Sequence, residues 1–126
     1  MTEVTNQSRI LLIEDDKALS KLTIMLLNRE HIEVIHAQDG EEALLLLNDQ
    51  EFNLIITDLN MPQIDGLTLI TELREKQSEI PIIVTTGVTN ESIHKQLHGL
   101  GVVKIYVKPL MSNIYGELIK DIKRYL

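Results

Sequence analysis

Residues 54–66 decide the fold of this chain and read LIITDLNMPQIDG. The first three residues of this stretch form an apolar, partly β-branched run, which is typical of a strand buried on both faces. Pro62 and the Asp65-Gly66 pair then force a loop soon after Asp58. Parallel sheets in α/β proteins bind their ligands at the carboxyl ends of strands. The stretch therefore predicts that Asp58 lies at the functional edge of a buried strand.

Five short apolar runs predict strands, and each leads into polar or charged residues. The first run is followed by the acidic triplet Glu14-Asp15-Asp16, the fourth ends in Thr85-Thr86, and the fifth is followed by Lys108-Pro109. The expected strands span residues 9–13, 33–37, 54–58, 82–86 and 104–107.

Between these strands, apolar residues recur every three or four positions, which indicates amphipathic helices. The first helix is expected over residues 17–29, and the second from the Asp39-Gly40 cap to about residue 48. The third is expected to end at about residue 76. The fourth is expected from Asn90 to about residue 100, and the last from about residue 112. The apolar face of the first helix is expected to consist of Ala18, Leu19, Leu22, Met25 and Leu26. That of the last helix is expected to consist of Ile114, Leu118, Ile122 and Tyr125.

The regular alternation of strand and helix predicts an α/β fold, a parallel sheet covered on both faces by right-handed crossovers. All strands of such a sheet end at the same edge. The topology therefore brings together side chains that are far apart in sequence, namely Glu14, Asp15, Asp58, Thr86 and Lys108.

The composition limits the function of the chain. Its 126 residues suit one domain with one sizeable core, here residues 9–126 after a disordered or extended tail of residues 1–8. A formal net charge of −7 disfavours direct nucleic-acid binding. The absence of cysteine excludes disulfides and fits a reducing compartment. Without a long apolar run or a signal-peptide pattern, no membrane span is expected, and the expected location is cytoplasmic.

The residues expected at the sheet edge indicate phosphoryl chemistry. Three converging carboxylates repel one another unless a cation intervenes, and oxygen ligands of this kind suit Mg²⁺. Such a site keeps positions open for phosphate oxygens. Asp58 is then a candidate nucleophile, Lys108 offsets the phosphoryl charge, and Thr86 is placed to donate a hydrogen bond.

Several motifs resemble the receiver domain of two-component response regulators. They are ILLIEDD at residues 10–16, TDLNMP at 57–62 with Asp65-Gly66, PIIVTTG at 81–87 and VKP at 107–109. The resemblance covers nearly the whole chain. It implies a flavodoxin-like doubly wound sheet with strand order 2-1-3-4-5 and five helices. It also implies Mg²⁺-dependent phosphoryl transfer from a histidine kinase phosphohistidine to Asp58, which switches a protein-interaction surface.

The resemblance also implies roles for individual residues. Asp58 is expected to be the phosphoacceptor and a metal ligand, Asp15 to bind Mg²⁺ directly, and Glu14 to act through water. The backbone carbonyl of Asn60 is expected to complete the protein ligands. Lys108 is expected to contact the phosphoryl group, and its bond to the following proline to be cis. The chain is thus expected to be a signalling domain that assists its own phosphorylation and dephosphorylation, and not an enzyme with turnover.

The switch residues are less regular than the acidic ones. Thr85 and Thr86 face opposite sides of a strand, and the position in the motif before Gly87 favours Thr86 as the switch hydroxyl. Many receivers have a rotating aromatic residue three positions before the lysine that corresponds to Lys108. This chain has Ile105 at that position, with Tyr106 beside it.

Two other functions are alternatives to the phosphoacceptor. A phosphatase of the haloacid dehalogenase type also uses an aspartate at a strand end, but it requires a second aspartate two residues later, where this chain has Asn60. The other alternative is an interaction module, or a fragment of a longer regulator or hybrid kinase.

The expected partners are a histidine kinase or phosphotransfer protein and a downstream protein target, with no membrane and no direct nucleic acid. An apolar patch of Val88, Leu100 and Ile105 leaves open a phosphorylation-linked homodimer. His94 and His98 share a helix face without a third ligand, so a solvated face is expected in place of a metal site.

Overall fold

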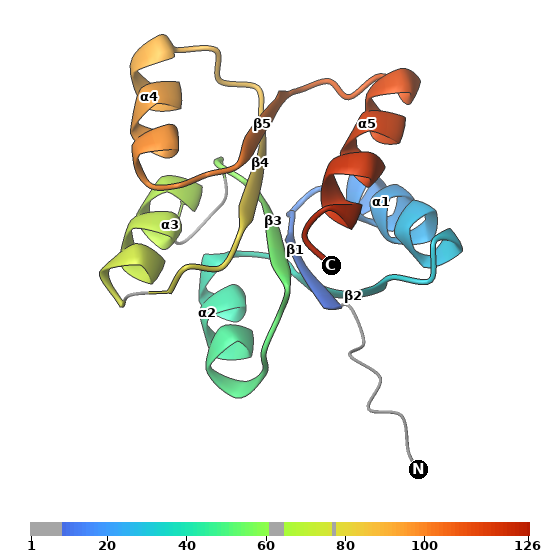
Figure 1. Ribbon diagram of the computed structural model, residues 1–126, viewed down its shortest axis with the longest axis horizontal. Coiled ribbons are helices and arrows are strands. Elements are labelled where there is room, and N and C mark those ends of the chain that lie inside the picture. Colours follow the sequence, from blue (N-terminus) through green and yellow to red (C-terminus); the bar gives the residue numbers. More distant parts are fainter. Residues whose placement is uncertain (1–8, 61–64, 77) are drawn as a thin grey trace.

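Five parallel strands form the centre of the computed structural model, which describes residues 9–60, 65–76 and 78–126 (Figure 1). They pair in the order β2-β1-β3-β4-β5, which confirms the predicted doubly wound α/β topology. The strands are β1 (Arg9–Ile13), β2 (Glu33–Ala37), β3 (Leu54–Asp58), β4 (Ile82–Thr86) and β5 (Lys104–Val107).

Five helices connect the strands and lie on both faces of the sheet (Figure 1). Most begin at a side-chain cap that satisfies free backbone amides: Asp16, Asp39, Asp65 and Asn90 each accept from the first turn of their helix. The helices are α1 (Lys17–Arg29), α2 (Gly40–Asp49), α3 (Gly66–Glu75), α4 (Glu91–Gly99) and α5 (Ser112–Lys123).

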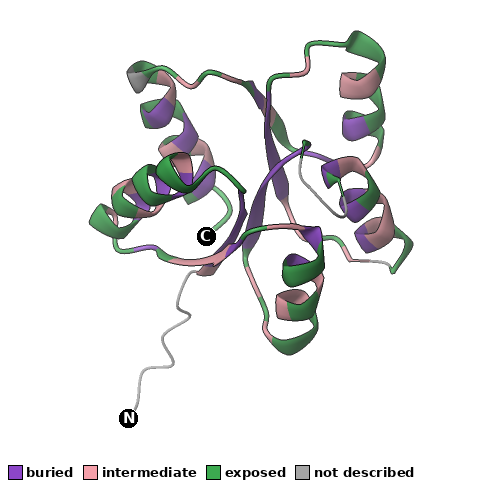
Figure 2. Cartoon of the chain, turned by 180° about the vertical axis from the view of Figure 1, so that it is seen from behind, coloured by how far each residue is buried: buried purple, intermediate pink, exposed green. Residues whose placement is uncertain are grey.

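The sheet separates two apolar cores, because successive side chains of a strand point to opposite faces. Leu11, Ile55 and Val84 pack toward α2, α3 and α4. Leu12 and Ile56 pack toward α1 and α5 on the other face. Figure 2 shows the central strands buried and the outer helix surfaces exposed. The three inner strands therefore carry the near-continuous apolar runs that made them recognisable in the sequence.

The predicted inner face of α1 is partly wrong. Leu19 and Leu26 are half-buried, but Ala18, Leu22 and Met25 are exposed. The helix instead buries Leu27 together with two hydroxyl residues, Ser20 and Thr23. Their side chains donate to backbone carbonyls one turn earlier in the same helix, at distances of 3.1 and 2.9 Å. A satisfied hydroxyl can be buried at little cost, so small polar residues replace leucine and methionine against the sheet.

The end of the last helix also differs from the prediction. Leu118 and Ile122 are buried as expected and Ile114 is half-buried, but Tyr125 is 38% exposed. Because α5 ends at Lys123, Tyr125 lies outside the helical period, and Tyr115 is the aromatic residue of α5 that packs into the core. The predicted tail of residues 1–8 lies outside the described residues, as do residues 61–64 of the opening motif. Within the described ranges, no helix is long and apolar enough to cross a membrane.

Candidate functional site

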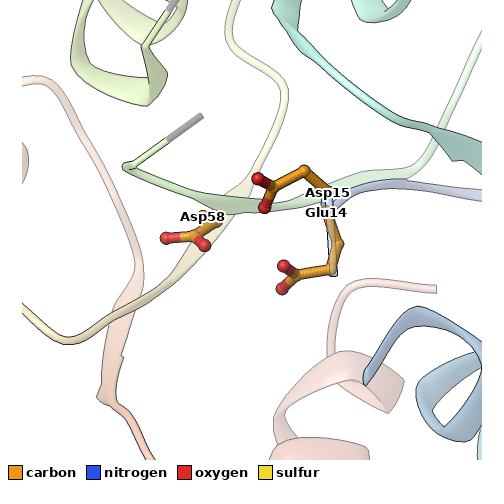
Figure 3. Close-up of side chains that lie close together, drawn as sticks. All are labelled: Glu14, Asp15 and Asp58. Atoms are coloured by element: carbon orange, nitrogen blue, oxygen red, sulfur yellow. The ribbon is translucent and has the colours of Figure 1, made fainter. Parts of the chain in front are cut away.

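The carboxyl ends of β1 and β3 bring three carboxylates together. Glu14 and Asp15 follow β1, and Asp58 is the last residue of β3. One carboxylate oxygen from each side chain lies within 4.8 Å of the others, and Figure 3 shows the three groups facing a common space. Glu14 and Asp58 are buried, whereas Asp15 is exposed. This arrangement follows from the parallel topology, since the two strands are direct neighbours in the sheet.

Glu14 is held at both its backbone and its side chain. Its amide donates to Ala37 O at 3.1 Å, and its Oε2 accepts from the Asp16 amide at 3.1 Å. Burial raises the pKa of Glu14, while the hydrogen bonds from Asp16 and Lys108 act against this rise. The loop after β1 therefore places a buried carboxylate whose charge needs a nearby cation.

Asp58 is 6% exposed and its two carboxylate oxygens have different partners. Oδ1 accepts from the Asn60 amide at 3.2 Å, and Oδ2 accepts from Lys108 Nζ at 2.8 Å. Its backbone carbonyl accepts from the buried Thr57 hydroxyl at 2.8 Å. Gly66 passes so close that a Cβ there would lie 2.4 Å from Asp58 O. The glycine of the opening motif thus allows α3 to begin directly against the strand end.

Lys108 links the two buried carboxylates. Its Nζ lies 2.8 Å from Asp58 Oδ2 and 3.1 Å from Glu14 Oε1. Burial by itself would lower the pKa of Lys108, but the contacts with Asp58 and Glu14 outweigh it and raise the pKa. The peptide bond to Pro109 is cis, as the family resemblance implied. Lys108 is therefore a cation fixed beside Asp58.

The charges in this site fit a divalent cation. One ammonium group stands against three carboxylates, so the cluster keeps excess negative charge. The donor atoms are all oxygens, which suits Mg²⁺. Asp15 is exposed at the rim, where an ion that keeps several waters can be reached from solvent. Asn60 follows Asp58 at the same edge and is also exposed.

Thr86 stands at the end of the neighbouring strand β4 and is fully buried. Its Oγ1 accepts from the Val88 amide at 3.0 Å, within the loop that leads to α4. Thr85 is instead the register partner of Asp58 across β3 and β4. The structure thus joins Glu14, Asp58 and Lys108 through side-chain contacts and places Asp15 within 4.8 Å of the other two acids. The Thr86 hydroxyl is instead bonded to its own loop.

Ile105 and Tyr106 lie on opposite faces of β5. Ile105 is half-buried against the α2, α3 and α4 core, the face that also carries Val84 and Thr86. Tyr106 packs in the α1 and α5 core and donates a hydrogen bond to Asp121. Burial and the contact with Asp121 raise the pKa of Tyr106. The aromatic residue of this strand is therefore turned away from Thr86.

Sequence reasoning missed two histidine contacts near the site. His94 was expected on a solvated face, but it is half-buried and its Nε2 lies 2.8 Å from Val88 O. His98 is exposed, as expected. His36 Nε2 lies 2.7 Å from Glu14 O. Both partners are backbone carbonyls in loops, so side-chain spacing in the sequence carried no signal for either contact.

Comparisons with known proteins agree with this geometry. Residues 10–120 match the family model of the response regulator receiver domain. A probable transcriptional regulator, ycf27 of Porphyridium aerugineum, is 33% identical over 118 residues, which cover 94% of this chain and 49% of that protein. The chain spans about half, or less, of the length of the first curated relatives it matches.

Two solved structures extend the likeness to three dimensions. A response regulator receiver protein from Pseudomonas putida is 31% identical with a TM-score of 0.84, covering 94% of this chain and 99% of that one. Thermotoga maritima TrrA, solved in complex with Mg²⁺-BeF, is 30% identical with a TM-score of 0.81 and the same coverage of 94% and 99%. The chain therefore belongs to the response regulator receiver domain family, the signalling domains of two-component systems.

Proposed function

We propose that this chain is a phosphoacceptor whose Asp58 receives a phosphoryl group from a phosphohistidine. The observation that carries the proposal is the environment of Asp58: a buried carboxylate at the sheet edge, bonded to Lys108 and beside Glu14 and Asp15. A carboxylate in this setting is a nucleophile with a cation already in position.

The transfer step exchanges one bond to phosphorus for another. An oxygen of Asp58 attacks the phosphorus in line, an O–P bond forms, and the N–P bond of the phosphohistidine breaks. The imidazole leaves with the electron pair of that bond and takes up a proton from solvent. Lys108, already 2.8 Å from Oδ2, stabilises the charge on the phosphoryl oxygens.

The proposed transfer uses Mg²⁺, because the candidate ligand atoms of the site are all oxygens. Asp15, Asp58 and the Asn60 carbonyl would hold the ion and Glu14 would contact its water, and the ion would offset charge on the phosphoryl oxygens. The chain's own residues shape the site: Asp15 lies at the exposed rim, and Glu14 holds the loop by accepting from the Asp16 amide. Asn60 has no acidic proton to give a leaving group, so phosphatase turnover is not part of the proposal.

The output is a change of surface on the α4 side of the sheet. The Thr86 oxygen accepts from Val88, which leaves its hydroxyl hydrogen available for a phosphoryl oxygen on Asp58. A movement of Thr86 toward Asp58 would pull on the loop before α4. We propose that a histidine kinase or phosphotransfer protein donates the phosphoryl group and that a downstream protein reads the changed surface. The proposal places residues 9–126 in the receiver domain and the domain in the cytoplasm.

Acetyl phosphate with Mg²⁺ tests the proposal without knowledge of the kinase. Intact-mass measurement should show one added phosphoryl group on the wild type and none on Asp58→Asn. Asp49→Asn is the matched control, because Asp49 is exposed at the end of α2 and should leave the mass gain unchanged. An equal mass gain in Asp58→Asn would overturn the proposal. Steady release of phosphate from unrelated phosphoesters would favour a phosphatase.

A further inference from the structure

We propose that His36 is a positioning residue for the metal-binding loop, because its imidazole fixes the peptide group that joins Glu14 to Asp15. This inference rests on the proposed function, since it concerns how the two acids are presented to Mg²⁺. His36 lies on the edge strand β2, outside the motifs that identify the family.

The contact has a defined chemical direction. His36 Nε2 lies 2.7 Å from Glu14 O, and the histidine is half-buried. A carbonyl oxygen can only accept, so the hydrogen must be on Nε2, and the imidazole donates. A hydrogen bond of this length in a half-buried place restricts rotation of the Glu14–Asp15 peptide plane.

The position of His36 follows from how the β1–β2 ladder ends. In the parallel register Leu12 faces His36 and Ile13 faces Ala37, and the Glu14 amide still donates to Ala37 O at 3.1 Å. If the ladder continued, a backbone amide beyond Ala37 would donate to Glu14 O. Strand β2 ends at Ala37, and the side chain of His36 supplies the donor for this carbonyl.

The bond from His36 completes the fixing of Glu14. The Glu14 amide is tied to Ala37, Oε2 is tied to the Asp16 amide, and the carbonyl is tied to His36. The direction of that carbonyl sets the direction in which the chain continues into Asp15. Asp15 is exposed, so it gains less support from its own surroundings than buried Glu14 does. Groups behind the ligands that fix their orientation contribute to metal affinity without touching the metal.

Isothermal titration of the unphosphorylated protein with Mg²⁺ alone tests this role. His36→Leu removes the donor and keeps a similar volume, and His36→Asn keeps a polar side chain that is too short to reach Glu14 O. Both should weaken Mg²⁺ binding by about two- to tenfold, the range expected for loss of one hydrogen bond. His36→Gln places an amide N–H near the position of Nε2 and should restore binding to within about twofold. His98→Leu, on the exposed side of α4, is the matched control and should bind as the wild type does.

The outcomes separate this inference from the proposed function. If His36→Leu and His36→Asn fold and bind Mg²⁺ as tightly as the wild type, the positioning role is wrong while the phosphoacceptor proposal stands. If all three variants, including His36→Gln, lose affinity equally, His36 has a packing role instead. If the wild type itself does not bind Mg²⁺, the proposed metal site fails and this inference fails with it. If His36→Leu does not fold, the Mg²⁺ affinities of His36→Asn and His36→Gln decide the question, because both variants keep a polar side chain.

Discussion

Lys108 joins Glu14 and Asp58 through two direct contacts, whereas Thr86, at the end of the next strand, accepts its hydrogen bond from Val88 in its own loop. We refer to Glu14, Asp15, Asp58 and Lys108 as the acid side of the site, and to Thr86, Val88 and Ile105 as the switch side. Acid-side residues lie at the ends of β1, β3 and β5, and Thr86 ends β4, which lies between β3 and β5. The two sides are nevertheless held by different kinds of contact.

Under the proposed function, we expect this difference to separate phosphoryl transfer from the change of surface that follows it. The acid side has its carboxylates and its ammonium group in place before any phosphoryl group arrives, which reduces the reorganisation needed for transfer. On the switch side, the Thr86 oxygen accepts from the loop, and the hydroxyl donates to none of the residues in 9–60, 65–76 and 78–126. The Lys108 amide already donates to Thr86 O at 2.7 Å, so the backbones of the two sides are joined. We expect a phosphoryl group on Asp58 to add a side-chain link between them. The following variants test this division, beginning with the largest expected effect.

Gly66→Ala should be the most damaging single change, because it forces a methyl group into the acid side. The new Cβ would lie 2.4 Å from Asp58 O and 2.8 Å from Leu59 Cα, both backbone atoms that cannot move independently. The expected loss of unfolding free energy is about 2–3 kcal/mol. Gly87→Ala is the control on the switch side, where a Cβ meets nothing within 4 Å, and it should change stability by less than about 1 kcal/mol. Urea denaturation measures both; equal losses would show that the two loops are packed alike.

Lys108→Met should weaken the acid side by removing its ammonium group. In Mg²⁺-free protein we expect a loss of about 1–2 kcal/mol, since two carboxylates lose a hydrogen-bonded partner that is itself partly exposed. The folded pKa of Lys108 is raised above its ordinary 10.5, so its contribution is complete at lower pH and disappears as pH rises through the folded value. Urea denaturation gives the difference in unfolding free energy between the wild type and Lys108→Met. This difference should be constant from pH 7 to about pH 10.5 and should shrink above that pH. A difference that grows with pH would contradict the ion contacts.

Thr86→Val should affect the switch side and leave transfer intact. The Val88 amide loses its acceptor, which should cost about 1 kcal/mol of unfolding free energy. Phosphorylation of Asp58 by acetyl phosphate should still add one phosphoryl group. Amide chemical shifts of residues 87–90 should respond less to phosphorylation than in the wild type. Full loss of phosphorylation in this variant would show that Thr86 belongs to the acid side.

Tyr106→Phe should have the smallest effect of the set. It removes the hydrogen bond to Asp121 on the α5 face and should lower the unfolding free energy by about 0.5–1 kcal/mol. Because Tyr106 faces away from Thr86, the rate of phosphorylation and the response of the α4 loop should not change. If the loop before α4 responded differently to phosphorylation in this variant, Tyr106 would take part in switching, which its position on β5 does not suggest.

The fold class and the shared edge of the acid-side residues follow from the sequence because all strands of a parallel sheet end at one edge, while the strand order was implied by the family resemblance. Apolar runs ending in Glu14, Asp58 and Lys108 place these residues at one edge of any parallel sheet. The inner face of α1 was mistaken because Ser20 and Thr23 count as polar in a periodicity argument, although each satisfies its hydroxyl within the helix.

The remaining contacts depend on loop paths and on the register of edge strands. His36 reaches Glu14 because β2 ends at Ala37, and His94 reaches Val88 because α4 begins close to the end of β4. Neither distance is encoded in residue spacing. Strand β5 is a similar case. The sequence shows that Ile105 stands three residues before Lys108, but it does not show which face of the sheet carries Tyr106.

The most direct test of the account is to locate the phosphoryl group on the chain. The wild type is phosphorylated with acetyl phosphate and Mg²⁺, reduced with borohydride so that an aspartyl phosphate becomes homoserine, and sequenced by peptide mass spectrometry. We expect homoserine at position 58 and unchanged residues at Asp15 and Asp65. Modification at another carboxylate, or a protein that binds Mg²⁺ and gains no phosphoryl group, would contradict the central claim that Asp58 is the phosphoacceptor.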